Sequence, residues 1–390
     1  MVRILSLLIL LPFLASGSSI KKQLVKKDLP FAEQQVQRMI DVMEESGKIL
    51  SPRTTKDGKI RYTSFQDWTS GFFPGSLWYL YKLTGKEEWK KEAEKYTEAL
   101  DKIQYLTWHH DIGFMIQCSY GNGLRFADKE AYKPVIVQAA KSLSTRFRPG
   151  AGIIQSWNVT GGWQAKRGWT CPVIIDNMMN LELLFEATAL SGDSSFYKIA
   201  VSHADQTLKY HFRPDNSSYH VVDYDPETGK VLHRHTAQGY AHESAWARGQ
   251  AWALYGYTVC YRYTKNKAYL EQAEKIAAYL FSHPRMPEDL VPYWDFDAPN
   301  IPNEPRDASA AAIIASALYE LNDYSKNNYR KTADRIMESL SSPAYTAKPG
   351  ENGNFILMHS VGSIPHGSEI DEPLVYADYY FLEAMKRRTK

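Results

Sequence analysis

Residues 169–184 read W-T-C-P-V-I-I-D-N-M-M-N-L-E-L-L, and the rest of the chain can be arranged around this stretch. Pro172 fits the first turn of a helix, and the run that follows is too apolar for a surface helix, so the stretch predicts a buried inner helix. Asp176 interrupts the apolar run, with Asn177 beside it and Asn180 one turn further on.

Asp176 in such surroundings is a candidate general acid. An ionised carboxylate is costly among apolar side chains, and the usual relief is a raised pKa that keeps the carboxyl protonated. A carboxylic acid that holds its proton at neutral pH can give it to a substrate. The stretch alone leaves a second interpretation open, in which Asp176 caps a neighbouring backbone or pairs with an arginine.

Length and composition describe a large folded protein without a nucleic-acid footprint. The chain has 390 residues, 44% of them hydrophobic, which predicts either two domains or one large closed architecture. Its 46 Lys and Arg against 44 Asp and Glu give a net charge of +2, which argues against nucleic acid as a partner. The 10 Trp and 26 Tyr supply many flat apolar faces that can stack on sugar rings, although most are expected in the core.

The N-terminus has the three parts of a secretory signal. Arg3 is the basic end, residues 4–14 are apolar, and residues 15–17 are small. We therefore expect residues 1–18 to be removed on export to the periplasm or beyond. No low-complexity segment or flexible linker divides residues 19–390, so we expect them to form a single domain. The apolar segment is too short to span a bilayer, so no membrane anchor is expected.

The cysteines do not form a disulfide framework. Cys118, Cys171 and Cys260 lie within or beside apolar helical patterns. Buried thiols, and at most one disulfide, are therefore expected.

A repeat of helical pairs runs along the chain. Each apolar helix ends in a turn, and an amphipathic helix follows that carries an aromatic residue and then an alanine on the same face, four places later. These pairs are Trp89 and Ala93, Phe196 and Ala200, Tyr269 and Ala273, and Tyr329 and Ala333, with a weaker copy at Tyr132 and Ile136. The apolar helices are expected near residues 72–83, 112–126, 172–190, 244–263, 308–321 and 373–385.

This alternation predicts an all-α fold, an (α/α)6 barrel of six helical hairpins. Inner helices of such a barrel are hidden from water all round, whereas outer helices show one polar face. A further helix is expected over residues 30–45 and a polar loop over 51–64. Residues 218–235 alternate and contain a turn at 227–229, which predicts a small β-hairpin inserted on one rim.

The loops that enter the inner helices would gather at one end of this barrel. Polar and aromatic residues at those entries would then face a common cavity, and their chemistry suits a carbohydrate with an anionic group. The candidates are Trp68, His110, Asp111, Trp157, Asp176, His220, Gln238, Arg248 and Trp252.

Each candidate also has a structural interpretation. Asp111 fits a helix N-cap, the histidines can be hydrogen-bonded core residues, and the tryptophans can be core packing. Arg248 is harder to explain in this way, since a cation in an apolar helix needs an anionic partner. Four histidines could be considered as metal ligands, but they lack the spacing of helical ligands, so no metal and no cofactor is expected. They are His109, His110, His233 and His235.

Seven blocks of sequence together resemble the unsaturated glucuronyl hydrolases of glycoside hydrolase family 88. They are H-H-D-I-G-F-M from residue 109, I-I-Q-S-W from 153, I-I-D-N-M-M-N-L from 174, Y-H-V-V-D-Y-D from 219, W-A-R-G-Q-A-W-A-L-Y-G from 246, D-A-S-A-A-A-I-I-A-S-A-L from 307 and P-L-V-Y-A-D-Y-Y-F-L-E-A from 373. The resemblance covers essentially the whole mature chain. It implies a barrel of six hairpins that removes the unsaturated uronic acid left by lyases at the non-reducing end of glycosaminoglycan fragments.

The resemblance also implies roles for the candidates. Asp176 would be the catalytic acid and base, with Asp111 as its essential partner, and the other candidates would contact the substrate. Asp176 would protonate C4 of the C4=C5 double bond, and water would add at C5. Because like charges at short range raise one pKa of a pair, Asp111 would help to keep Asp176 protonated, and Arg248 would balance the substrate carboxylate.

The part of the substrate beyond the cleaved sugar is less well defined by the sequence. Ser360 and Ser363, in the segment 357–368, are candidates for contacts to sulfate or hydroxyl groups, although an ordinary Gly- and Pro-containing loop also explains the segment. Two other functions stay open from the residues. One is a related hydrolase of unsaturated rhamnogalacturonyl fragments, and the other is a non-catalytic glycan-binding barrel.

Overall fold

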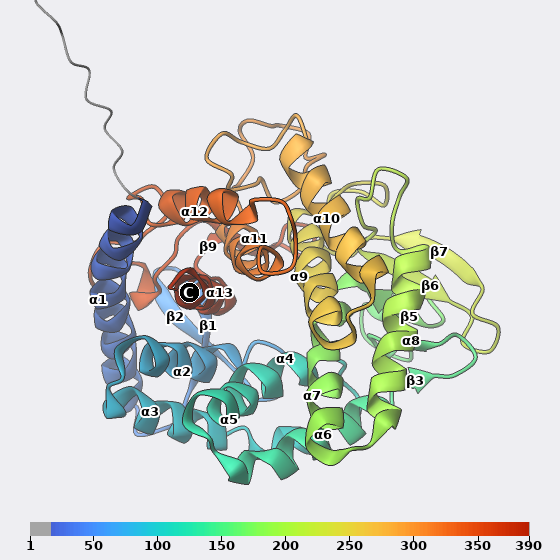
Figure 1. Ribbon diagram of the computed structural model, residues 1–390, viewed down its shortest axis with the longest axis horizontal. Helices are drawn as coiled ribbons and strands as arrows, with labels where there is room; N and C mark the ends of the chain where they lie inside the picture. Colours follow the sequence, from blue (N-terminus) through green and yellow to red (C-terminus); the bar gives the residue numbers. More distant parts are fainter. Residues whose placement is uncertain (1–16, 390) are drawn as a thin grey trace, which may run out of the picture.

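The computed structural model describes residues 17–389, in which a ring of inner helices is surrounded by outer helices (Figure 1). The inner helices are α2 (Phe72–Thr84), α4 (Ile112–Ile116) continued by α5 (Asn122–Ala127), α7 (Leu181–Ser191), α9 (Ala247–Thr264), α11 (Ala308–Leu321) and α13 (Val375–Arg388). The outer helices are α1 (Gly17–Glu44), α3 (Glu87–Glu98), α6 (Lys133–Ser144), α8 (Ser194–Tyr210), α10 (Lys267–Ser282) and α12 (Tyr329–Leu340). The predicted (α/α)6 barrel is confirmed.

The last inner helix closes the ring. α13 packs against both α2 and α11, and α11 in turn packs against α9, so helices from the two ends of the chain lie side by side. Every residue of α11 is buried, whereas α12, which covers it, buries one face only. This difference is the one that the alternation of apolar and amphipathic segments predicts.

The aromatic and alanine pairs of the repeat dock the outer helices on the inner ones. Four of the five copies bury both members, and in the fifth copy Tyr329 is half-buried while Ala333 is fully buried. Each pair lies on one face of its helix because residues four apart are neighbours on a helix surface.

The central stretch differs from the predicted helix at its beginning. Pro172–Ile174 is a strand, β5, and Ile175–Asn180 is a 3-10 turn that leads into α7. β5 pairs antiparallel with β6 (Val221–Tyr224), which places the β-branched Val173 and Ile174 in a conformation that suits them. Asp176 therefore lies in a buried turn between a strand and a helix.

Residues 17–389 also form four small β-sheets. The predicted hairpin at 218–235 is present as β6 and β7 (Val231–His235), with β5 as a third strand. The segments 51–64 and 357–368 are not loops, because they form the hairpins β1 (Ser51–Lys56) with β2 (Lys59–Thr63) and β8 (Ser360–Ser363) with β9 (Ser368–Glu372). Thr54 of β1 is buried, bridges to Leu374 and donates to the carbonyl of Pro373, and this tertiary contact holds the polar segment.

The remaining elements are short. β3 (Phe147–Arg148) pairs with β4 (Ile153–Ile154), and a π-helical turn at Gln117–Gly121 separates α4 from α5. Further 3-10 turns lie at Asp101–Tyr105, Glu130–Tyr132, Gln164–Arg167 and Asn352–Asn354.

Only some of the predictions for the N-terminal region can be compared with the structure. The predicted signal segment lies outside the described residues except for Gly17 and Ser18, which begin α1. The helix expected over 30–45 is the second half of α1. Within residues 17–389 no helix combines the length and hydropathy needed to cross a membrane. All three cysteines are buried and free, as expected.

Candidate active site

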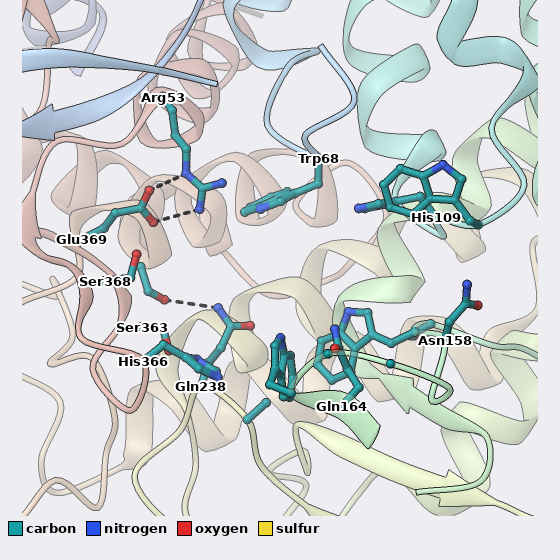
Figure 2. Close-up of a pocket in the computed structure, with 18 of the residues that line it drawn as sticks. Arg53, Trp68, His109, Asn158, Gln164, Gln238, Ser363, His366, Ser368 and Glu369 are labelled. Carbon is teal, nitrogen blue, oxygen red and sulfur yellow. Dashed lines mark hydrogen bonds and ion pairs between the residues drawn. The ribbon is translucent and has the colours of Figure 1, made fainter. Parts of the chain in front are cut away.

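A cavity of about 660 Å³ opens among the loops and hairpins at one end of the barrel. Side chains from β1, from the loop before α2, from the segment 156–164 and from the β8–β9 hairpin surround it (Figure 2). Five of the predicted site residues line its surface: Trp68, Trp157, Gln238, Arg248 and Ser363. The loops therefore gather at a common cavity, as the barrel predicts.

The two predicted acids lie below this surface. Asp176, in the 3-10 turn before α7, is 8% exposed, and Asp111, just before α4, is 7% exposed. Neither belongs to the residues that line the cavity, but Asp176 is close enough to the lining residue Arg248 for their charges to interact. A substrate group would have to reach down from the cavity to meet them.

Burial sets the protonation of Asp176. Loss of hydration raises the pKa of its carboxyl from 3.8 to about 7, although the positive charge of Arg248 opposes the rise. Its Oδ2 atom has no hydrogen-bond partner among the described residues. Asp176 is therefore a carboxyl that can carry a proton near neutral pH and is not committed to another protein group.

Asp111 does not act as a helix cap. It occupies the N-cap position of α4, but its side chain makes no capping hydrogen bond. Asn180 instead donates to its Oδ1 at 3.2 Å, and Nε2 of His110 lies 3.3 Å from its Oδ2. Burial raises the pKa of Asp111 to about 8, with a smaller contribution in the same direction from the charge of Asp176. Burial is therefore the main cause of the raised pKa of both carboxyls, and repulsion between them, which is mutual, is the smaller effect.

A glycine allows this arrangement. A Cβ atom on Gly113 would lie 2.5 Å from Cα of Asn180, so only glycine lets the two segments approach so closely. Asn180 uses the approach to accept from the backbone N–H of Phe114 at 3.0 Å. Because its oxygen is occupied in this way, its amide nitrogen is the atom turned toward Asp111.

His220 is neutral and its tautomer follows from its contacts. Burial, reinforced by Arg248, holds the pKa of the imidazole well below its usual range. Its Nδ1 accepts from the backbone N–H groups of Ala237 and Gln238, at 3.1 and 3.2 Å, so the proton must be on Nε2. Nε2 lies 3.8 Å from Oδ2 of Asp176, with its N–H available to that oxygen.

His110 is also buried and neutral. Burial lowers the pKa of its imidazole, and the neighbouring His109 and Arg146 act in the same direction. His109, which the sequence suggested only as a metal ligand, lines the cavity and accepts from the backbone N–H of Asp111 at 3.0 Å. The two stacked imidazoles thus support the backbone and side chain of Asp111 from one side.

Arg248 has its anionic partner inside the protein. Its guanidinium lies 3.2 Å from Asp307, donates to the carbonyl of Gly362 at 2.7 Å and also donates to the carbonyl of Val361. Its positive charge is therefore paired with Asp307 within the fold, while Arg248 also lines the cavity, so its role as the counter-ion of a substrate carboxylate stays a prediction. The residue ties α9 to α11 and to the β8–β9 hairpin.

Four predicted contact residues do not line the cavity surface, namely the buried His110 and His220 described above, and Trp252 and Ser360. Trp252 is fully buried on α9, where it packs against Phe114 and Tyr380 in the barrel core. Ser360 is also fully buried, because β8 turns its side chain inward, whereas Ser363 lines the cavity and bonds to His366 at 2.7 Å. The hydrophobic pattern of the sequence cannot distinguish a buried side chain from one that lines the cavity here, since Trp252 and Ser360 both lie in elements that border the site.

Several lining residues were missed by the sequence. Trp108 and Trp163 are exposed indoles on the cavity wall. Arg53 of β1 also lines the cavity, where it forms an ion pair with Glu369 (Figure 2) and a second one with Asp67. Two tryptophans in the polar segments W-H-H-D and G-G-W-Q were a usable signal, because indoles outside apolar patterns are candidates for sugar stacking. The pairing of Arg53 depends on β9, more than 300 residues away, and had no local signal.

Arg146 is buried behind the cavity wall formed by Ser156 and Asn158, and it has no acidic partner there. It donates to the backbone carbonyls of Gln155, Ser156 and Thr107 and to the side chain of Asn158. Within the described chain it forms no ion pair. Its charge therefore remains uncompensated behind Asn158, which lines the cavity.

The histidines considered as metal ligands are not brought together. Among residues 17–389 no group of three or more His, Cys, Asp or Glu side chains is placed to hold a metal ion. His233 and His235 stack on each other on β7, and His109 and His110 stack separately beside Asp111.

Comparison with known proteins gives a consistent result. The model of Glycosyl Hydrolase Family 88 matches residues 32–388. A Formosa agariphila protein named unsaturated glucuronyl hydrolase is 51% identical over 325 residues, which cover 83% of this chain and 80% of that protein.

Solved structures agree with that match. A crystal structure of an unsaturated glucuronyl hydrolase specific for heparin superposes with a TM-score of 0.89 at 48% identity, and covers 94% of this chain and 97% of its own. The unsaturated glucuronyl hydrolase of Bacillus sp. GL1, described as responsible for the degradation of glycosaminoglycan, gives a TM-score of 0.83 at 31% identity, covering 94% and 96%.

Proposed function

We propose that this chain, which belongs to glycosyl hydrolase family 88, removes 4,5-unsaturated glucuronic acid from the non-reducing end of lyase-generated glycosaminoglycan oligosaccharides. The observation that carries the proposal is the buried carboxyl of Asp176, whose pKa is raised to about 7 below a cavity walled by indoles. The names of the relatives support the substrate class. Such a sugar is a vinyl ether, and an enzyme can attack its double bond by donating a proton to carbon.

Asp176 supplies that proton. Transfer from its carboxyl to C4 leaves a cation shared by C5 and the ring oxygen, and leaves Asp176 as a carboxylate. Its pKa of about 7 suits donation near neutral pH. The Nε2–H of His220 lies 3.8 Å from Oδ2, beyond hydrogen-bond distance, so it would have to move closer to donate to the carboxylate formed in this step.

Water then completes the reaction. It adds to C5 as Asp176 takes back a proton, which restores the acid for the next turnover. The product at C5 is a hemiketal, which opens to a ketone and returns the ring oxygen to C1 as a hydroxyl. The hemiacetal at C1 then releases the remaining saccharide. This route is a hydration that ends in cleavage, so it needs neither of the two standard separations between glycosidase carboxyls.

A substrate panel tests the proposal. Unsaturated glucuronyl disaccharides, sulfated and unsulfated, should lose the ultraviolet absorbance of the conjugated double bond when mixed with the protein, whereas unsaturated rhamnogalacturonyl disaccharides should react much more slowly. In heavy-oxygen water, with the product carbonyls reduced at once to prevent exchange with the solvent, the label should appear on C5 of the released sugar. Label on C1, or no loss of absorbance at any pH, would contradict the mechanism or the activity, respectively.

Export is a separate proposal. The basic, apolar and small-residue order of residues 1–17 supports secretion to the periplasm or beyond. Fractionation of cells that express the full chain, with N-terminal sequencing of the product, should find a mature protein that begins near residue 19. An intact N-terminus in the cytoplasm would contradict this part of the proposal.

A further inference from the structure

A second hollow of about 380 Å³ adjoins the active-site cavity. Ala237 lines both, and the guanidinium of Arg167, which lines the second hollow, lies 5.7 Å from the ring centre of Trp163 in the wall of the first. His366 and Gln238, which line the first cavity (Figure 2), are the sequence neighbours of Pro365 and of Ala237 and Gly239, which line the second hollow. The two spaces therefore follow one another along the rim, as successive sites for one chain molecule would.

The charge of Arg167 is not matched by an acid. Within residues 17–389 it forms no ion pair, and its contacts are the faces of Trp163 and Trp169. The ionisable side chains that face it are basic, namely His235 and His366. Two acids in the surrounding segments have other partners: Asp223 accepts from the backbone of Thr170 and Cys171, and Glu243 lies 3.5 Å from Arg213.

An aromatic platform lies on the same hollow. Tyr240 is 49% exposed although it carries a large apolar ring, and it lines the hollow together with His242. Its backbone N–H is held by Asp295 at 2.9 Å, which fixes the position of the residue while leaving the ring open. An exposed ring beside an unpaired guanidinium suits a sugar that has an apolar face and an anionic substituent.

We propose that this second hollow binds an acidic sugar of a longer substrate, beyond the terminal disaccharide that the proposed function places in the active-site cavity. The inference rests on the proposed function. Arg167 pairs with a carboxylate or sulfate of that sugar, and the ring of Tyr240 stacks on its face. In an alternating uronic acid and hexosamine chain, the third sugar carries a carboxylate even when no sulfate is present, so an unsaturated tetrasaccharide offers the required anion.

The test compares chain lengths in matched variants. The values of kcat/KM for unsaturated disaccharides and tetrasaccharides, unsulfated and sulfated, are measured for the wild type, Arg167→Gln, Arg167→Lys and Tyr240→Ala. For Arg167→Gln the ratio of tetrasaccharide to disaccharide kcat/KM should fall about two- to fivefold, the effect of one partly exposed ion pair, and Arg167→Lys should recover most of it. Tyr240→Ala should lower the same ratio. Lys166→Gln, an exposed neighbour outside both spaces, is the control and should leave both substrates unchanged.

The outcomes separate this inference from the proposed function. Absence of disaccharide turnover by the wild type contradicts the function itself. Normal disaccharide turnover, with a ratio that does not change in Arg167→Gln and Tyr240→Ala, overturns the second site alone. A ratio that falls for both tetrasaccharides assigns the carboxylate as the anion, and one that falls only for the sulfated substrate assigns the sulfate. Added salt should weaken tetrasaccharide turnover in the wild type more than in Arg167→Gln.

Discussion

Replacement of Asp176 by asparagine should abolish turnover and at the same time stabilise the protein at high pH. Asparagine has nearly the same shape as a protonated aspartic acid, but it has no acidic proton to give to a substrate. We therefore expect turnover to fall by a factor of about a thousand or more, in line with the loss of an essential acid. The effect on stability is the sharper test, because it depends only on the burial of the carboxyl.

The size of that effect follows from the pKa. Burial raises the pKa of Asp176 from 3.8 to about 7. Between these values the unfolded chain has lost the proton while the folded protein still holds it, so wild-type stability falls as the pH rises and then levels off above the folded pKa. A difference of about 3 pH units at 1.36 kcal/mol each gives about 4 kcal/mol. The asparagine variant has no carboxyl to ionise at this position, so its stability does not fall in this way.

Denaturant unfolding of both proteins at several pH values measures the difference. The unfolding free energy of Asp176→Asn should be close to that of the wild type near pH 4 and higher by up to about 4 kcal/mol near pH 8. Asp41→Asn, on the exposed face of α1, is the control and should show neither effect. A stability difference that is the same at both pH values, or substantial remaining turnover, would refute the assignment of Asp176 as a buried acid.

Four further outcomes are expected. The wild-type kcat should fall about tenfold per pH unit above pH 7, because Asp176 loses its proton there, and a pH–rate profile measures this. Arg248→Ala should lower the unfolding free energy by about 3 to 5 kcal/mol, since it leaves Asp307 buried without its cation; a small loss of stability with a raised KM would instead make Arg248 a substrate contact. Gly113→Ala should destabilise the fold by about 1 to 3 kcal/mol in thermal or denaturant unfolding, because its Cβ would meet Asn180. Dialysis against a chelator should leave turnover unchanged, and a loss restored by added metal would contradict that expectation.

Helix periodicity was enough to predict the barrel. The segments 72–83 and 308–321 coincide closely with α2 and α11, because a buried helix needs an apolar surface all round and that requirement is visible in local sequence. The failures lie where pairing with a distant segment decides the conformation. Residues 172–174 form a strand because β6 lies beside them, and Thr54 is in a hairpin because Leu374 covers it.

The sequence by itself determined the ring of helical pairs and singled out Asp111 and Asp176, because residue type and spacing are local properties. Only the tertiary structure decided what state those carboxyls are in and which neighbours they have. Dehydration of Asp176, the tautomer of His220 and the pairing of Arg248 with Asp307 all depend on groups brought together from distant parts of the chain. Protonation and charge balance depend on distance in space and on access of water, and neither quantity can be read from order along the chain.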